Sequence, residues 1–464
     1  MGRVSSPASP TSPVVAILTI AYFMLLACGA LLSSTWAATL VALMFALEQG
    51  LQASSGFFIS NVQFVNVFVG ALTGVSIGAI LLRRPDELRN TLLFPLIGTL
   101  VLYMWSAVSL AWSPSTLHGP PYVRGGIPYI ILFVVLAPLL VPNVDRLGSM
   151  LRMMLYLGTV LVALLVVNPN LTFYSGRLGL QIEGSVRSNP LAIGELGGCL
   201  ILLATLLREG PKQWLMNAAR ATAFLIGGLL ALQSGSRGQL IFSVGLALIL
   251  LPLSKRIKNV FQFIATLVLV VLVVPLLLWV AQTFLYADVL GRWDTEQLSG
   301  GFAVRLMNDL DLLAVWAGNP VAWITGLGFN AFAVVTTAGA KEHYPHNILV
   351  EVLAEEGLPM FVLMLLIFFR TFRDGLWLFR RFAEQPVERA SVSALIALAL
   401  YFFLIANKQN NLWGQGPLFL YCCMIARIRA RTAEADALDA AYEVPAASET
   451  EEADPAQPAL PQRA

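Results

Sequence analysis

The stretch LLFPLIGTLVLYMWSAVSLAW, from Leu92 to Trp112, contains no charged residue and decides the fold class. An α-helix needs about 20 predominantly apolar residues to cross the hydrocarbon core of a bilayer. Comparable runs recur along most of the chain. They are Phe57 to Leu82, Pro128 to Val141, Leu151 to Val167, Leu191 to Leu207, Thr222 to Gln233, Leu240 to Leu253, Val260 to Leu285, His346 to Phe369, Ala390 to Ala406 and Pro417 to Ile428, with the apolar stretch from Pro13 to Ser54 before them.

The composition also indicates a membrane protein. Of the 464 residues, 57% are hydrophobic and only 12% are charged, which is about half of the roughly 25% that a soluble domain carries. We therefore expect one all-α membrane domain in contact with lipids, and not two or three soluble domains. A net charge of +2 gives no reason to expect a nucleic-acid partner.

The basic residues set the expected orientation, because cytoplasmic loops are enriched in Lys and Arg. Basic clusters near Arg83, Arg146, Arg208, Lys255 and Arg370 all fall on one side when the runs above alternate in direction. We assign that side to the cytoplasm. The opposite side then holds residues 112–126, 168–189, 234–238, 286–345 and 408–416.

The N-terminal apolar stretch leaves two interpretations. Two helices within Pro13 to Ser54 place the N-terminus outside, whereas one helix there places both ends of the chain in the cytoplasm. We prefer one helix, which predicts a polytopic bundle of about twelve transmembrane helices over residues 1–431. Residues 432–464 are rich in Ala, Glu, Asp and Pro, and we expect a disordered cytoplasmic tail.

The connection from Tyr286 to Pro345 is far longer than the others, and long loops are usually functional or folded. Apolar residues recur at helical spacing from Arg305 to Trp316, with Asp309 four residues after Arg305. Gly318, Asn319 and Pro320 then provide a stop signal. The sequence predicts a large helical loop that lies at the outer membrane surface.

His346 stands where this loop meets the next apolar run. A histidine at a membrane–water boundary can accept a proton near neutral pH, although an interfacial polar residue that caps the helix is the simpler alternative. Asn347 follows it, and Glu351 lies about one helical turn below. Glu351 could orient His346 or pair with an arginine, or it could be solvated at the interface.

Arg237 lies in a very short outer turn, Gln233-Ser-Gly-Ser-Arg-Gly-Gln239. Flanking glycines let the backbone approach an anion, and an arginine offers a two-pronged donor for phosphate. A stray surface arginine is the alternative. Arg187, Arg292 and Arg305 also fall on the outer side, so this face is a candidate for binding a lipid diphosphate. The chain has no nucleotide-binding or metal-binding motif, and we expect no cofactor and no metal.

Three ordered segments resemble the bacterial O-antigen ligase and O-antigen polymerase superfamily of membrane glycan transferases. The first is Ser234-Gly-Ser-Arg-Gly238. The second is Arg305 followed by an amphipathic helix, Pro320 and Gly326-Leu-Gly328. The third is His346-Asn347 followed by Glu355-Glu356-Gly357-Leu358. Arg187-Ser-Asn189-Pro190 is similar to the family's Arg and Asn-Pro, although Leu191 stands where the family often has another Asn.

The resemblance implies a glycosyltransferase of the bacterial inner membrane whose active site faces the periplasm. It would transfer a glycan en bloc from undecaprenyl diphosphate to a lipid A core sugar, with inversion and without a metal. The implied catalytic residues are His346, Arg237 and Arg305, and the implied substrate-binding residues are Arg187, Asn189, Ser236, Arg292, Asn347 and Glu351. A polymerase that joins two lipid-linked repeats is the first alternative. A secondary transporter of an anionic substrate is the second, and it predicts charges near the bilayer midplane.

Overall fold

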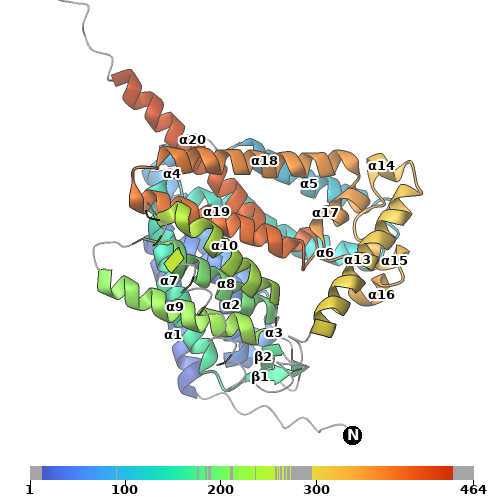
Figure 1. Ribbon diagram of the computed structural model, residues 1–464, viewed down its shortest axis with the longest axis horizontal. Helices are drawn as coiled ribbons and strands as arrows, with labels where there is room; N and C mark the ends of the chain where they lie inside the picture. The colour runs from blue at the N-terminus through green and yellow to red at the C-terminus, as the bar shows by residue number, and fades with distance from the viewer. Residues whose placement is uncertain are drawn as a thin grey trace, which may run out of the picture.

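The computed structural model describes most of the chain. It covers residues 13–255 apart from 90, 175–176, 183–184, 187–189, 209–212 and 236, isolated positions between 259 and 279, and residues 295–442. Helices make up most of the described chain and pack side by side (Figure 1). Most of the expected span from Val260 to Leu285 and the first part of the long loop lie outside the described residues.

Seven helices in the described part of the chain are long and apolar enough to cross a membrane. They are α1 (Pro13–Leu32), α4 (Phe64–Arg83), Gly119–Leu140, α7 (Val144–Val166), α9 (Gln213–Gln233) from Trp214 onward, α10 (Arg237–Lys255) up to Ser254, and α19 (Pro386–Ala406). The helix Gly119–Leu140 consists of α6 (Gly119–Ile130), the π-helical turn η2 (Ile131–Leu136) and the 3₁₀ turn η3 (Ala137–Leu140). This confirms the membrane protein that the composition indicates.

The remaining helices complete the bundle. They are α2 (Ser34–Ser54), α3 (Gly56–Ser60), η1 (Pro85–Leu88), α5 (Phe94–Ser109), α8 (Pro190–Leu206), α18 (Leu358–Arg381) and α20 (Gly416–Tyr442). The run from Leu92 to Trp112 thus yields a helix that stops at Ser109, because the next residues turn to bind the long loop. Helix α20 continues past Thr432, so residues 432–442 are helical and not disordered as we expected; residues 443–464 lie outside the described part.

The stretch from Pro13 to Ser54 forms two helices, which corrects our preference for one. The chain breaks at Ser33, whose backbone is extended and whose hydroxyl accepts a hydrogen bond from the N–H of Thr35 at 3.3 Å. Helices α1 and α2 pack against each other as a hairpin, with Thr19 beside Gly50 and the Trp36 ring over Gly29. A serine N-cap stabilises the start of the second helix.

Basic clusters that are distant in sequence meet at one end of the bundle, which we call the basic end. Arg146 contacts Glu87 at 2.8 Å and the Ser34 hydroxyl at 3.0 Å, and Arg427 donates to the Glu87 carbonyl. Arg389 donates to the carbonyl of Leu253, near the end of α10, at 2.7 Å. The turn between α1 and α2 therefore lies at the basic end, and α1 begins at the opposite end.

The opposite end, which we call the loop end, carries the polar connections. The Asn170 amide donates to the Ala53 carbonyl at the end of α2, at 2.8 Å. A small antiparallel sheet that the sequence did not predict lies next in the chain: β1 (Leu171–Tyr174), β2 (Arg177–Ile182) and β3 (Ser185–Val186) in the order β1-β2-β3. The long loop adds α13 (Thr295–Ala317), α14 (Ala322–Thr325), α15 (Phe332–Val335) and α16 (Gly339–Glu342).

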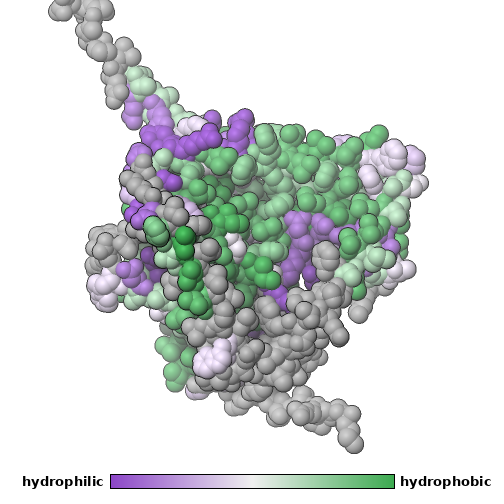
Figure 2. All heavy atoms as spheres, in the orientation of Figure 1, coloured by the Kyte–Doolittle hydropathy of each residue, from purple (hydrophilic) through white to green (hydrophobic). Residues whose placement is uncertain are grey.

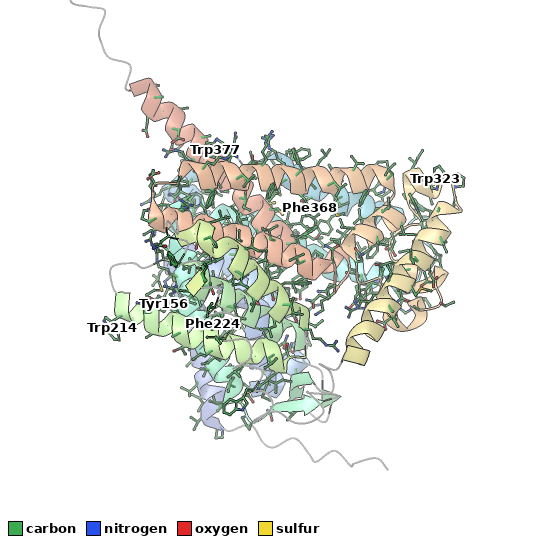
Figure 3. The ribbon with its side chains drawn as sticks, viewed as in Figure 1. Tyr156, Trp214, Phe224, Trp323, Phe368 and Trp377 are labelled. Atoms are coloured by element: carbon green, nitrogen blue, oxygen red, sulfur yellow. The ribbon has the colours of Figure 1, made fainter. Side chains whose placement is uncertain are left out.

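Tryptophans mark both ends of the bundle. In Figure 3, Trp214 and Trp377 lie at the left, toward the basic end, and Trp323 lies at the far right on α14. The Arg429 guanidinium lies over the Trp377 ring at 5.3 Å from its centroid. Between these ends the visible surface is largely hydrophobic (Figure 2). Aromatic residues at both borders of an apolar band are typical of a membrane-spanning bundle.

Candidate functional site

A polar seam at the loop end connects α16 to α17 (Ile348–Glu351). His343 and His346 have φ values of 62° and 66°, in the left-handed region that residues other than glycine seldom occupy. The Nε2 atom of His346 lies 3.0 Å from Oε2 of Glu342, and the imidazole packs edge-on against Tyr344 with 4.4 Å between ring centroids. Strained backbone tends to occur at functional sites, and the side chain that caps α17 belongs to Asn347 and not to His346.

The carboxylate beside His346 is Glu342, so of the alternatives considered for Glu351 the structure does not support an orienting contact with His346. Glu351 is 1% exposed, and its Oε1 accepts a hydrogen bond from the N–H of Leu412 at 2.9 Å. Its other oxygen has no hydrogen-bond partner among the described residues. Glu351 thus holds the connection between α19 and α20 in place, one helical turn after Asn347.

Asn347 joins the seam to α13. Its Oδ1 caps α17 by accepting from the N–H groups of Leu349 and Val350, and its Nδ2 donates to Oδ2 of Asp309 at 2.9 Å. Burial raises the pKa of Asp309, while the hydrogen bond from Asn347 and the charge of Arg305 lower it. Arg305 has an exposed side chain one turn before Asp309. Asp309 thus lies between two of the predicted site residues.

The Gly326-Leu-Gly328 segment explains how the loop is held. Gly326 and Gly328 have φ values of 75° and 94°, and a Cβ on Gly326 would lie 2.0 Å from the Glu355 carbonyl oxygen. The N–H of Leu327 donates to Ala354 and that of Gly328 to Glu355, both at 2.9 Å. These acceptors belong to the π-helical turn η5 (Val352–Glu356), so the glycines allow the loop backbone to pair with the end of α17.

Buried polar groups continue this attachment. The Glu355 carboxylate, 1% exposed, accepts from the N–H groups of Asn330 and Phe332 at 2.6 and 2.9 Å. The Ser115 hydroxyl donates to the Asn330 side chain at 2.7 Å, and the Ser113 hydroxyl donates to the Phe329 carbonyl at 2.6 Å. The loop is therefore a packed part of the bundle end.

Arg237 begins α10 after the turn that follows α9. Gly235 in this turn has a φ of 65°. The aliphatic chain and amine of Lys408 lie against Gly238, where an added Cβ would be 2.7 Å from Nζ. The Gln239 amide donates to Oε1 of Gln409 at 3.1 Å. The turn thus brings Arg237 and Lys408 into one cationic neighbourhood.

The segment of residues 407–415, between α19 and α20, links the two groups of residues. Gln409 binds Gln239 on one side, and it also donates to the Glu195 carboxylate on α8. The backbone of Asn410 is within hydrogen-bonding reach of the Tyr344 phenol, whose pKa is raised by burial and then by the nearby Tyr122 and Glu342. No role was predicted for this segment from the sequence. Five consecutive polar residues, 407–411, between two apolar runs are the signal that could have revealed it.

Beside this segment lies a cavity of about 500 Å³. Its wall comes from α2, α6, α8, α19 and the residues that follow Asn410, and it contains aromatic, amide and carboxylate side chains. Figure 2 shows hydrophilic atoms in the region where Figure 1 places α6 and α17, between two apolar surfaces. Neither His346 nor Arg237 belongs to the wall, so these residues do not line the cavity.

The structure thus places His346, Asn347 and Arg305 in one group and Arg237 in another, both at the loop end. Each group adjoins the 407–415 segment, the first through Tyr344 and the second through Gly238. The predicted residues Arg187, Asn189, Ser236 and Arg292 lie outside the described residues.

Comparison with known proteins finds no matching family model and no matching curated protein. The fold defines the chain as a helical integral membrane protein, and the described candidate residues lie at the end of the bundle opposite to the basic clusters.

Proposed function

We propose that the protein is a metal-independent, inverting membrane glycan transferase of the O-antigen ligase type. It would move a glycan from undecaprenyl diphosphate to a lipid A core sugar at the periplasmic face of a bacterial inner membrane. The observation that carries the proposal is the His346–Glu342 pair at the loop end, on a strained backbone and linked to the Arg305 helix through Asn347 and Asp309.

The topology is part of the proposal. The basic end would face the cytoplasm, in accordance with the positive-inside rule. Residues 260–285 would form a further span. Because α1 and α2 are separate helices, the proposed number of spans rises from about twelve to about thirteen. The N-terminus of α1 would then lie on the periplasmic side, with the proposed catalytic residues.

The proposed reaction is a single displacement. Because Nε2 of His346 contacts Glu342, Nδ1 of His346 takes the proton from the acceptor hydroxyl as its oxygen attacks the anomeric carbon, and Glu342 stabilises the imidazolium that forms. The bond between the anomeric carbon and the diphosphate oxygen breaks, and undecaprenyl diphosphate leaves with the bonding electrons. Arg237 and Arg305 stabilise the charge that develops on the diphosphate. Attack from the face opposite to the leaving group accounts for inversion.

The test is transfer by purified protein in lipid nanodiscs supplied with an undecaprenyl-diphosphate glycan and a lipid A core acceptor. His346→Ala and Arg237→Ala are expected to lower the rate by about 10²-fold or more. Arg305→Lys should also be impaired, because a point charge does not replace a planar guanidinium. Arg373→Ala, an exposed arginine on α18, is the control. Wild-type transfer by His346→Ala would refute the assignment of the base.

A parallel reaction with a second lipid-linked repeat as acceptor separates the ligase from the polymerase. Elongation of the lipid-linked glycan without transfer to lipid A core would replace the ligase by the polymerase. An anion transporter is disfavoured because Arg237 and Arg305, the predicted cationic residues that the structure describes, lie at one end of the bundle and not at its middle.

A further inference from the structure

The cavity beside residues 407–415 has features that the proposed catalytic residues do not explain. It occupies about 500 Å³, within the range of small-molecule sites in proteins. Its wall extends from residues of the connecting loops, such as Val62 and Asn410, to side chains well inside the bundle, such as Phe133 and Phe402. A ligand could therefore enter from the loop end and reach between the helices.

Two buried polar groups in the wall have unsatisfied atoms. Gln49 is 7% exposed and its Oε1 has no hydrogen-bond partner among the described residues. Asn411 is 4% exposed; its Oδ1 accepts from the N–H of Gly414 at 3.2 Å, but its Nδ2 has no partner there. An unpaired buried acceptor or donor costs free energy. One acceptor and one donor in a single cavity suit a ligand whose hydroxyl groups both donate and accept.

The remaining wall residues limit which kind of ligand the cavity can bind. Trp413, Tyr122 and Tyr129 provide aromatic surface. Glu48 and Glu195 provide two carboxylates, which accept from the side-chain amides of Gln52 at 3.1 Å and of Gln409 respectively. Carboxylates repel phosphate and attract amines. The lining therefore favours a ligand with apolar ring faces, several hydroxyl groups and no negative charge.

We propose that this cavity binds a neutral or amino-bearing sugar ring of the substrate glycan and excludes sugars that carry phosphate. The identification of the ligand as a sugar rests on the proposed function. The charges on either side of Gln409 then have separate tasks. Arg237 faces the diphosphate, whereas Glu48 in the cavity wall selects an uncharged ring; Lys408 lies within electrostatic reach of Glu195 and offsets part of its charge.

The experiment measures binding directly and does not depend on transfer. Full-length protein in lipid nanodiscs, free of sugar-based detergent, is titrated with methyl glucoside, glucosamine and glucose 6-phosphate, and saturation-transfer NMR reports the bound ligand. We expect dissociation constants on the order of 1 mM for the first two sugars. Glucose 6-phosphate should bind at least about tenfold more weakly, because like charges oppose it.

The variants locate the site. Gln49→Leu removes the unpaired acceptor and should weaken binding of both uncharged and amino sugars by about threefold to tenfold. Glu48→Gln keeps the shape and should reduce the discrimination against glucose 6-phosphate. Gln63→Leu is the matched control, since Gln63 is exposed and lies outside the cavity wall.

The outcomes separate this inference from the proposed function. Absence of saturation transfer, tightest binding of glucose 6-phosphate, or unchanged affinity in both Gln49→Leu and Glu48→Gln would overturn the sugar site even if glycan transfer is intact. Binding in the expected order, lost in the variants, would support the site even if the wild-type protein transfers no glycan. Arg237→Ala should lose transfer and retain sugar binding.

Discussion

Replacement of Gly326 by alanine tests whether the long loop is held against the bundle as a folded unit. Gly326 has a φ of 75° and a ψ of 170°, a combination that is essentially restricted to glycine. A Cβ at this position would lie 2.0 Å from the carbonyl oxygen and 2.4 Å from the carbonyl carbon of Glu355. Both neighbours are backbone atoms, so neither can rotate away.

The expected cost follows from these contacts. An alanine in this backbone conformation costs roughly 1–3 kcal/mol. Relief of the overlap separates the loop from η5 and breaks the hydrogen bonds from Leu327 to Ala354 and from Gly328 to Glu355, at about 1 kcal/mol each. The attachment should weaken by roughly 3–5 kcal/mol, so amide exchange in the loop should accelerate by about 10²-fold or more.

Hydrogen–deuterium exchange with mass spectrometry on protein in nanodiscs measures this change in the peptide that contains Leu327 and Gly328. Gly70→Ala is the matched control, because nothing lies within 4 Å of the added Cβ and the residue is inside α4. Alanine there should be neutral or slightly stabilising. Equal protection of residues 326–332 in Gly326→Ala and Gly70→Ala would refute the reasoning.

Two further substitutions test the seam and the C-terminal helix. Asn347→Asp keeps an oxygen that can cap α17 but places a second carboxylate beside Asp309. Because burial already raises the pKa of Asp309, thermal unfolding should show that the variant is less stable than the wild type, and more so at pH 8 than at pH 5. The reverse pH trend would contradict this contact. Asp436 accepts hydrogen bonds from Arg381 at 2.7 to 3.1 Å, which lowers the pKa of Asp436. The contribution of this pair to the stability of the helix end is therefore present at neutral pH and lost as the pH falls through that lowered pKa. Asp436→Asn should increase amide exchange in residues 432–442 at neutral pH, whereas unchanged exchange would show that the pair does not hold the helix.

The membrane-protein class and the approximate positions of the helices were predictable from the sequence, because hydrophobic length alone decides whether a helix can cross a bilayer. The division of Pro13 to Ser54 was also encoded, by Ser33 and Ser34 in an apolar run, but we gave these residues too little weight. Hydropathy averages over about 19 residues, so a single capping serine barely changes it. The sheet of residues 171–186 was missed for a related reason, because its strands are short and contain no apolar run long enough to register.

The candidate site was likewise only partly predictable from the sequence. His346, Asn347, Arg305 and Arg237 could be named from the sequence, since polar residues at the ends of apolar runs are conspicuous. Their partners could not. Glu342 meets His346 only because the backbone turns through left-handed conformations at His343 and His346, and the 407–415 segment acquires its role only because α8, α10 and the long loop pack around it. The sequence by itself determined a many-helix membrane protein with a large polar loop, because that property depends on composition. Only the tertiary structure decided which side chains meet at the loop end and where the cavity lies, because those contacts join residues that are far apart along the chain.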